Sequence, residues 1–517
     1  MLILDSLGPV AQLVARLVRN EKVTGSIPVR STQTLRLCGY PCHADGMLAI
    51  RNVVTSLAAV ALLLLSGCTP QQATDSSFEV QDSEFISEDA AEASIDDGAP
   101  LWELKPSPFA VDLCKIPDGR PSEMQTLRQG ALSLGTYGMS NVGFPASPDL
   151  IPTMGESHYI AVAVSFPDLV GDPENLDEYL REQTELMSEW VDFWSQGVHR
   201  YTFDVVEGWL EVPSSAESFR VDDRSRSQRT TGVHAALAGE IAMELGSDVD
   251  WEKVDGILAV FPLSFTSFPG DWNGRGDPIV TPAGVLPMFY YGGGPFHLTA
   301  SNGIPLETKR ELLWSFWIHE ILHSQSMNLH APGNGWPVGL DRNQYPAGYE
   351  KFSGAANSWE LFKIGWIMDD QVHCIDAQET VPGSQVMLTP LEVEGGDRKI
   401  AIVRTGPHSG LLVESRRPIG YTKWNAEDSG IMVSRLDTTV MNDRSGEGGD
   451  DCGNNPDYAK WAYFLAPDGS VGLENSCFFE EFILSEGDAV SADGVTIELV
   501  HSSTDLDYVS VFPAQGE

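Results

Sequence analysis

Residues 308–330 read TKRELLWSFWIHEILHSQSMNLH and contain the pattern HExxH as His319, Glu320 and His323. In a helix, residues four apart lie on one face, so His319 and His323 can direct two imidazoles at one metal ion. A hydrolytic zinc site takes three protein ligands and keeps one position open, and Glu320 lies beside the ligands as a candidate general base. The alternative interpretation is a core helix whose two histidines are hydrogen-bonded for structural reasons alone.

A third metal ligand is expected shortly after this helix. Asn328 tolerates the left-handed backbone conformation with which many helices end. The residues that follow, Pro332, Gly333 and Gly335, disfavour a further helical turn. The chain therefore turns back near His330, which makes this imidazole the expected third ligand.

Composition bounds the class of protein. A chain of 517 residues predicts two or three domains, and its 42% of hydrophobic residues, with 13 Trp and 21 Phe, predicts large cores. The net charge of −42 excludes nucleic acid as a partner, because so acidic a chain cannot neutralise phosphates. Residues 69–100 are acidic and poor in large apolar side chains, which predicts a disordered tether.

The first residues of the chain predict export. Residues 1–46 resemble a peptide translated by mistake from a tRNA gene, so we expect the true start at Met47; a genuine extension is the alternative. Residues 47–68 contain an apolar run at residues 57–65 that is too short to span a membrane. The run ends in Leu-Ser-Gly-Cys, which resembles a bacterial lipoprotein signal with Cys68 as the lipidated residue. An ordinary secretory signal is the alternative, and it also predicts export.

Four cysteines follow the predicted signal: Cys114, Cys374, Cys452 and Cys477. An even number in an exported chain predicts disulfides, and four cysteines allow three connectivities. We favour Cys114–Cys374 and Cys452–Cys477. A zinc site of four cysteines is the alternative, but no CxxC spacing supports it.

Strand and helix patterns alternate between residues 155 and 261. The predicted strands are residues 159–166, 201–212 and 254–261, and the predicted helices are residues 175–196 and 231–245. Residues 262–303 are rich in Gly and Pro and predict loops and short strands, with a turn at Gly276-Asp277-Pro278.

Short alternating strands begin near residue 375 and predict a β-sandwich. They are expected at residues 399–404, 410–415, 430–436, 461–465, 495–500 and 508–512. Residues 442–457 are crowded with oxygen ligands and glycine, but their spacing is not that of an EF-hand. A Ca²⁺ loop and a plain solvated loop both stay open there.

The segment HEILHSQSMNLH is similar to the metzincin zinc motif HExxHxxGxxH. It lacks the glycine and has one extra residue before the last histidine. The wider region, roughly residues 155–440, resembles the immune inhibitor A family of secreted bacterial metallopeptidases. Three stretches carry that resemblance: residues 357–366, 410–417 with Glu-x-Arg, and 429–437 ending in Asp.

The resemblance implies an α+β zincin-like catalytic domain at residues 101–374, which contains the active-site HExxH helix. The alternating short strands predict an all-β sandwich-like domain at residues 375–517. Zn²⁺ would be bound by His319, His323 and His330, with Asp341 as the alternative third ligand. Glu320 would act as the general base in peptide hydrolysis.

The resemblance further implies a protein or peptide substrate. The lipoprotein signal at Cys68 predicts a location on the outer face of the bacterial cell envelope, in contact with the membrane only through the lipid anchor, and we expect a monomer. Tyr345 and Tyr349 are candidates for stabilising the oxyanion, and each could equally be a core residue. The family commonly has a methionine in the turn beneath the metal, where this chain has Phe352. The missing glycine and methionine motivate the alternative of an inactive zincin-like binding module. A third interpretation is a substrate-binding or adhesion lipoprotein with an accidental HExxH.

Overall fold

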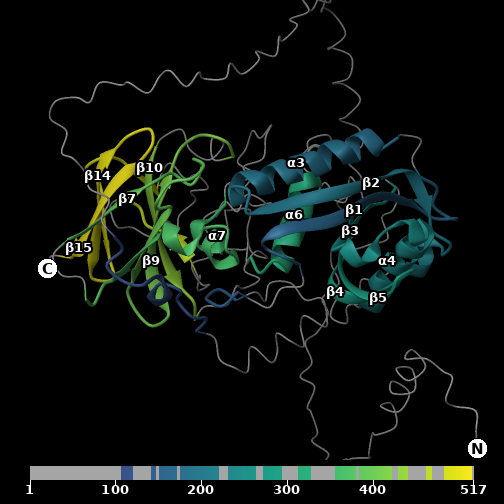
Figure 1. The fold of residues 1–517 in the computed structure, drawn as a ribbon, viewed down its shortest axis with the longest axis horizontal. Coiled ribbons are helices and arrows are strands. Elements are labelled where there is room, and N and C mark those ends of the chain that lie inside the picture. Colours follow the sequence, from purple (N-terminus) through teal and green to yellow (C-terminus); the bar gives the residue numbers. More distant parts are fainter. Residues whose placement is uncertain are drawn as a thin grey trace, which may run out of the picture. The chain divides into compact units, whose positions relative to one another are not determined.

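The computed structural model describes most of the chain from residue 106 onward (Figure 1). The described residues are 106–119, 141–146, 151–171, 175–219, 231–262, 272–293, 313–327, 356–379, 383–421, 429–439, 462–467 and 482–514. All of them belong to one compact unit, Ala99–Glu517. The expectations for residues 1–46, Cys68 and the tether at residues 69–100 lie outside the described ranges. Within those ranges, no helix combines the length and the apolar character that crossing a membrane requires.

A five-stranded sheet with the order β2-β1-β3-β5-β4 forms the first half of this unit. β1, β2, β3 and β5 are parallel, and β4 runs antiparallel to β5 at the edge. The strands are β1 (Gly155–Ser165), β2 (His199–Glu211), β3 (Gly256–Val260), β4 (Trp272–Thr281) and β5 (Gly284–Gly293). The strand and helix order predicted up to residue 261 is therefore confirmed.

Helices cover both faces of this sheet. Tyr159 and Ala161 of β1 belong to a core that also contains α3 (Asp177–Ser195). Ile160 and Val162 belong to a second core, which contains α4 (Thr231–Leu245). Because side chains alternate along a strand, α3 and α4 lie on opposite sides of β1 (Figure 1). Burial on both sides explains why β1 is nearly continuously apolar.

The predicted turn at Gly276-Asp277-Pro278 is wrong. These residues lie inside β4, where the pairing with β5 shifts register between Arg275 and Asp277. The chain instead turns after Thr281, whose hydroxyl donates to the Gly284 carbonyl at 2.9 Å. Gly284 has φ 127°, a conformation that a side chain disfavours, so this glycine determines where the hairpin turns.

Two packed sheets form the second half, as the all-β pattern predicts. One sheet has the order β11-β10-β9-β8-β6, with β12 also paired to β10, and the other has the order β13-β14-β15-β7. An apolar core lies between them, with Val403 and Leu411 from the first sheet and Val386 and Ile497 from the second. The strands are β6 (Val372–Asp376), β7 (Ser384–Leu388), β8 (Ile400–Arg404), β9 (Ser409–Arg416), β10 (Gly430–Asp437), β11 (Ala462–Phe464), β12 (Ile483–Leu484), β13 (Ala489–Ala492), β14 (Val495–Ser502) and β15 (Asp507–Pro513).

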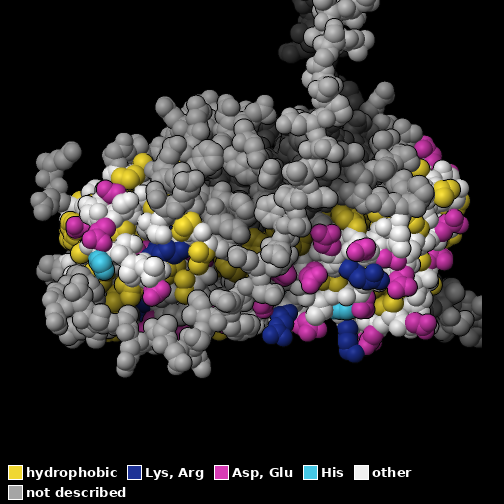
Figure 2. Space-filling view, turned by 90° about the horizontal axis from the view of Figure 1, so that it is seen from above, with side chains coloured by type: hydrophobic (Ala, Val, Ile, Leu, Met, Phe, Trp, Pro, Cys, Tyr) yellow, Lys and Arg dark blue, Asp and Glu magenta, His cyan; other side chains and the backbone are white. Residues whose placement is uncertain are grey.

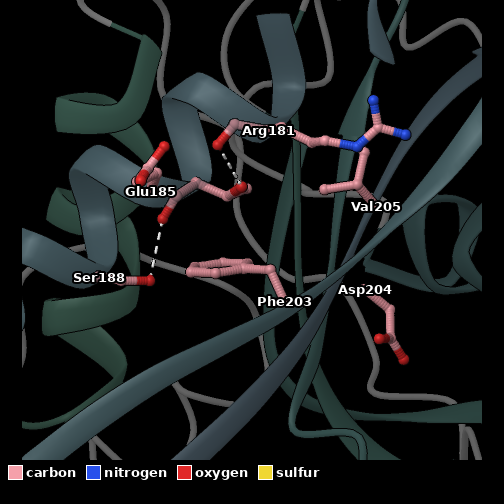
Figure 3. A pocket seen from close by; sticks show the side chains of 7 residues that line it. Arg181, Glu185, Ser188, Phe203, Asp204 and Val205 are labelled. Atoms are coloured by element: carbon pink, nitrogen blue, oxygen red, sulfur yellow. Dashed lines mark hydrogen bonds between the residues drawn. The ribbon is translucent and has the colours of Figure 1, made fainter. Parts of the chain in front are cut away.

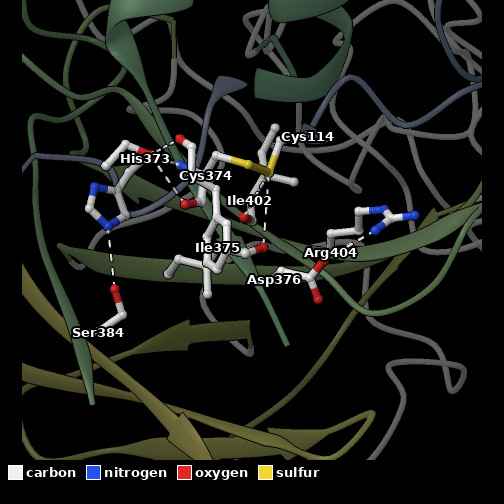
Figure 4. The surroundings of a disulfide bond; sticks show 10 residues. Cys114, His373, Cys374, Ile375, Asp376, Ser384, Ile402 and Arg404 are labelled. Atoms are coloured by element: carbon white, nitrogen blue, oxygen red, sulfur yellow. Dashed lines mark hydrogen bonds and ion pairs between the residues drawn. A yellow bond between two sulfur atoms is a disulfide. The ribbon is translucent and has the colours of Figure 1, made fainter. Parts of the chain in front are cut away.

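The boundary expected between residues 374 and 375 falls inside β6, which pairs in parallel with β8 of the sandwich. An earlier segment also lies against the sandwich: the Gly119 N–H donates to the Thr438 carbonyl at 3.1 Å. Cys114 and Cys374 form a disulfide with an S–S distance of 2.09 Å (Figure 4). This is the pairing favoured from the sequence, whereas Cys452 and Cys477 lie outside the described residues.

The described surface carries both signs of charge. Figure 2 shows Asp and Glu side chains spread over one face with Lys and Arg between them. Exposed or partly exposed ion pairs include Lys115–Asp369 at 2.7 Å and Arg181–Glu207 at 3.4 Å. Such pairs contribute less than about 1 kcal/mol each, so the stability of the fold rests on its cores.

Candidate metal centre on helix α6

The HExxH pattern lies in helix α6 (Leu313–Ser324), on the same side of the sheet as α3. His319 and His323 are four residues apart in this helix, which places their Cα atoms on one face. Their side chains lie outside the described part of the structure, as do His330, Asp341 and the whole stretch 328–355 with Tyr345 and Tyr349. The structure therefore describes the backbone of the helix, whereas the side chains of all the proposed metal ligands lie outside the described residues.

Helix α6 is a core helix. All of its described side chains are buried, so the part of its circumference that they cover packs into the core. They are Leu313, Trp314, Trp317, Ile318, Glu320, Ile321, Leu322 and Ser324. Glu320 is the only carboxylate among these described side chains, with 6% of its surface exposed. Burial of a carboxylate costs free energy unless a hydrogen bond or an opposite charge offsets it.

The left-handed residue that follows the helix is Ser326 rather than Asn328, where the sequence predicts it. Ser326 has φ 74°, in the left-handed region. The Met327 N–H donates to the Leu322 carbonyl at 3.0 Å, the bond that closes a Schellman motif. Met327 and Leu322 are both buried in the same core, which supplies the apolar contact of this motif. The apolar contact therefore fixes the end of the helix two residues earlier than backbone preference alone suggests.

A buried polar cluster lies at this end of α6, around Gln325. The Tyr201 hydroxyl of β2 donates to Gln325 Oε1 at 2.7 Å, and Gln325 Nε2 donates to the Pro152 carbonyl. Gln325 Nε2 also lies 3.0 Å from His199 Nε2. Because an amide nitrogen can only donate, this His199 nitrogen must accept, and the ring is neutral. Burial lowers the pKa of His199 to about 4, in agreement with a neutral ring.

The other end of α6 is held by α3. Gln183 Oε1 accepts the backbone N–H of Trp314 at 3.0 Å. This N–H lies in the first turn of α6, where no carbonyl of the same helix can bind it. Sequence reasoning did not assign Gln183 or Gln325 a role. A signal existed for Gln183, because it follows Leu180 on the buried stripe of α3, where a polar residue needs a partner.

Two segments of the family resemblance meet at helix α7 (Ser358–Ile364). Asn357 caps the helix, because its side-chain oxygen accepts the N–H groups of Trp359 at 2.8 Å and Glu360 at 3.1 Å. The carboxylate of Glu414 in β9 accepts the Ser358 N–H at 3.1 Å. The third segment is β10, which pairs with β9 along its whole length.

The Glu-x-Arg of β9 is a buried structural cluster. Arg416 donates to Glu414 at 2.7 Å and 2.9 Å and to Glu392 at 3.1 Å. It also donates to the Ala356 carbonyl, just before α7, and its guanidinium lies 5.8 Å from the centre of the Trp194 ring in α3. Arg416 thus joins the sandwich to α7 and α3, and the described geometry gives this motif a structural role.

An open groove of about 550 Å³ lies between α3 and β2 (Figure 3). Its lining contains Arg181 and Glu185 from α3 and Phe203 and Asp204 from β2. None of its described lining residues belongs to α6. In the described part of the chain, no group of three or more His, Cys, Asp and Glu side chains could hold a metal ion.

Comparison with known proteins gives no match. No family model matches the sequence, and no curated protein matches it.

Proposed function

We propose that the protein is a zinc-dependent endopeptidase whose metal centre is built on α6. The observation that carries the proposal is that the HExxH pattern lies within one helix packed into the core. Two imidazoles four residues apart are a donor set that suits zinc. His319 and His323 would hold the ion, with His330 as third ligand and Asp341 as its alternative. When bound, Zn²⁺ supplies a Lewis acid that polarises the scissile carbonyl.

Glu320 is the proposed general base. It follows His319 directly in α6, and its side chain is buried rather than exposed to solvent. In this role Glu320 accepts a proton from the attacking water and donates it to the leaving amine. The Glu320→Gln variant keeps the size and burial of the side chain but cannot carry the proton.

The backbone at Ser326 supports the zincin-like interpretation. Ser326 occupies the position at which the HExxHxxGxxH motif has its glycine, and its φ of 74° is a conformation that glycine favours. The missing glycine is therefore a weaker argument for an inactive binding module than the sequence suggests. β4 is the antiparallel edge strand of the described sheet, and an extended peptide can add to the edge of a sheet.

Zinc content and peptide cleavage test the proposal on the exported chain. We expect one zinc ion per chain and cleavage of casein that the Glu320→Gln variant loses by a factor of at least about 100. Stoichiometric zinc without cleavage that depends on Glu320 would favour the binding module. A chain without zinc would favour the adhesion lipoprotein.

We further propose a monomer exported to the outer face of the cell envelope and anchored through Cys68. Its substrate would be a protein or peptide, and nucleic acid would not be a partner. Fatty-acid labelling that a Cys68→Ala variant retains would contradict the anchor.

Residues 442–457 stay a proposed Ca²⁺ loop with a solvated loop as the alternative, and calcium titration of the purified chain distinguishes the two.

A further inference from the structure

Helix α6 is bound at both ends by side-chain amides. At its start, Gln183 of α3 accepts the Trp314 N–H at 3.0 Å. Just beyond its end, Gln325 is hydrogen-bonded to Tyr201 of β2 and to the Pro152 carbonyl before β1. Gln183 is 2% exposed and Gln325 is fully buried, so water does not compete for these bonds.

These bonds restrict movements that apolar packing tolerates. A buried helix can slide along its axis or rotate while it still covers apolar surface, because the hydrophobic effect has no direction. A shift by one residue moves every side chain about 1.5 Å along the axis and about 100° around it. Such a shift would break the bonds of Gln183 and Gln325 and leave buried polar groups without partners, at a cost for each group.

Gln325 connects α6 to a fixed part of the sheet. The Tyr201 ring lies 5.1 Å from the Tyr159 ring and 5.3 Å from the His199 ring. The Ser195 hydroxyl at the end of α3 donates to the His199 carbonyl at 2.9 Å. β1, β2 and α3 therefore hold the phenol that orients Gln325, which lies two residues after His323.

We propose that Gln183 and Gln325 are positioning residues that set the axial place and rotation of His319 and His323. This inference rests on the proposed zinc site. It assigns the two glutamines no contact with metal or substrate, and their effect passes through α6. Partners that orient ligands typically change metal affinity by about 10 to 100 fold when they are lost.

Zinc affinity measured by competition with a chromophoric chelator tests the inference on the full chain. Gln325→Met and Gln183→Met keep the volume of each side chain and remove its hydrogen bonds. We expect the zinc Kd to rise about 10-fold in Gln325→Met and less in Gln183→Met, whose single bond lies farther from His323. Gln196→Met is the matched control, because Gln196 is also an amide clamp, bonded to Leu391, Val393 and Gly395, and none of these lies in α6.

The melting temperature, read on the same samples, separates positioning from stability. A control with a lowered melting temperature and an unchanged zinc Kd, beside raised Kd values in the α6 variants, supports the inference. Lowered melting temperatures with unchanged Kd values in all three variants would overturn it. Wild-type chain that binds no zinc would instead defeat the proposed metal centre itself.

Tyr201→Phe keeps the test decisive if Gln325→Met does not fold. This variant removes one hydroxyl from the cluster and keeps the ring. We expect a rise in zinc Kd of a few fold in this single variant. If Gln325→Met does fold, the double variant Tyr201→Phe, Gln325→Met should show no further rise beyond the glutamine change alone. An unchanged zinc Kd in Tyr201→Phe, or additive effects of the two changes on Kd, would contradict a role for the hydrogen bond between Tyr201 and Gln325.

Discussion

Ser326 holds a backbone conformation that residues with a side chain rarely adopt. Its φ of 74° closes the Schellman motif at the end of α6. A left-handed conformation costs a residue other than glycine about 1 kcal/mol. We therefore expect Ser326→Gly to raise the free energy of unfolding by about 0.5 to 1 kcal/mol, and Ser326→Val to lower it, as measured by urea denaturation.

Ser324 supplies the control for this prediction. It is the last residue of the same helix, is also buried, and does not share the positive φ of Ser326. Ser324→Gly should lower the free energy of unfolding by about 1 kcal/mol, because glycine in a helix loses more backbone freedom on folding. Changes of the same sign at both serines would show that the conformation of Ser326 is not the cause.

His199 makes stability depend on pH. Burial lowers its pKa from an ordinary 6.5 to about 4, so between these values the unfolded chain binds a proton that the folded chain does not. Its contribution is therefore complete above pH 6.5 and decreases as the pH falls toward 4, by about 3 kcal/mol in all. We expect the unfolding free energy of His199→Gln to fall less steeply than that of wild type across this window, in urea titrations at several pH values. If the unfolding free energies of the two proteins fell equally steeply with pH, His199 would not be the cause of the pH dependence.

At the scale of elements, Arg416 fixes α7 against β9. Replacement by Met leaves Glu414 and Glu392 buried without their guanidinium partner, and both carboxylates are almost fully excluded from solvent. Breaking a buried charge pair from one side costs about 3 to 5 kcal/mol, and we expect that loss of unfolding free energy in Arg416→Met. Arg404→Met is the control, since its pair with Asp376 is partly exposed and should contribute less than about 1 kcal/mol. Similar losses in the two variants would contradict a special role for the cluster.

Elements that bury a regular apolar pattern could be predicted from the sequence, and those that depend on distant partners could not. α4 is predicted with its observed bounds, and β1 and α3 within a few residues, because each of them buries apolar side chains in a regular pattern. The hairpin β4–β5 was underestimated, because its glycines and prolines weaken the pattern while pairing between the strands stabilises it. β6 and β7 were missed because they are short and are defined by their neighbours in the sheets.

In the candidate site, too, local features could be predicted from the sequence and contacts between distant residues could not. The HExxH pattern and its apolar neighbours predicted α6, since both are local properties of the sequence. The bond from Gln183 to Trp314 joins residues 131 positions apart, and the bond from Tyr201 to Gln325 joins residues 124 apart. No local pattern reports such pairings, so the residues that hold α6 became visible only in the fold. His330 and Asp341 remain predictions from the sequence.

At the scale of the whole molecule, the two predicted domains share one core. A single apolar cluster contains Trp190 and Trp317 from the helices together with Ile402, Leu412 and Met432 from the sandwich. The Cys114–Cys374 disulfide closes a separation of 260 residues across the same region. The disulfide constrains the unfolded chain, and for so long a loop this constraint contributes up to about 5 kcal/mol to the free energy of unfolding.

Residues 101–374 should therefore not fold as an independent domain. A chain that ends at residue 374 cuts β6 within its pairing with β8 and removes Glu392, Glu414 and Arg416, which hold α7 and cover Trp194. It also removes Ile402, Leu412 and Met432 from the apolar cluster that contains Trp317. We expect this fragment to show no cooperative thermal unfolding by circular dichroism, whereas residues 99–517 unfold in one transition. A soluble 101–374 fragment with a sharp transition would show that the sandwich is a separable domain.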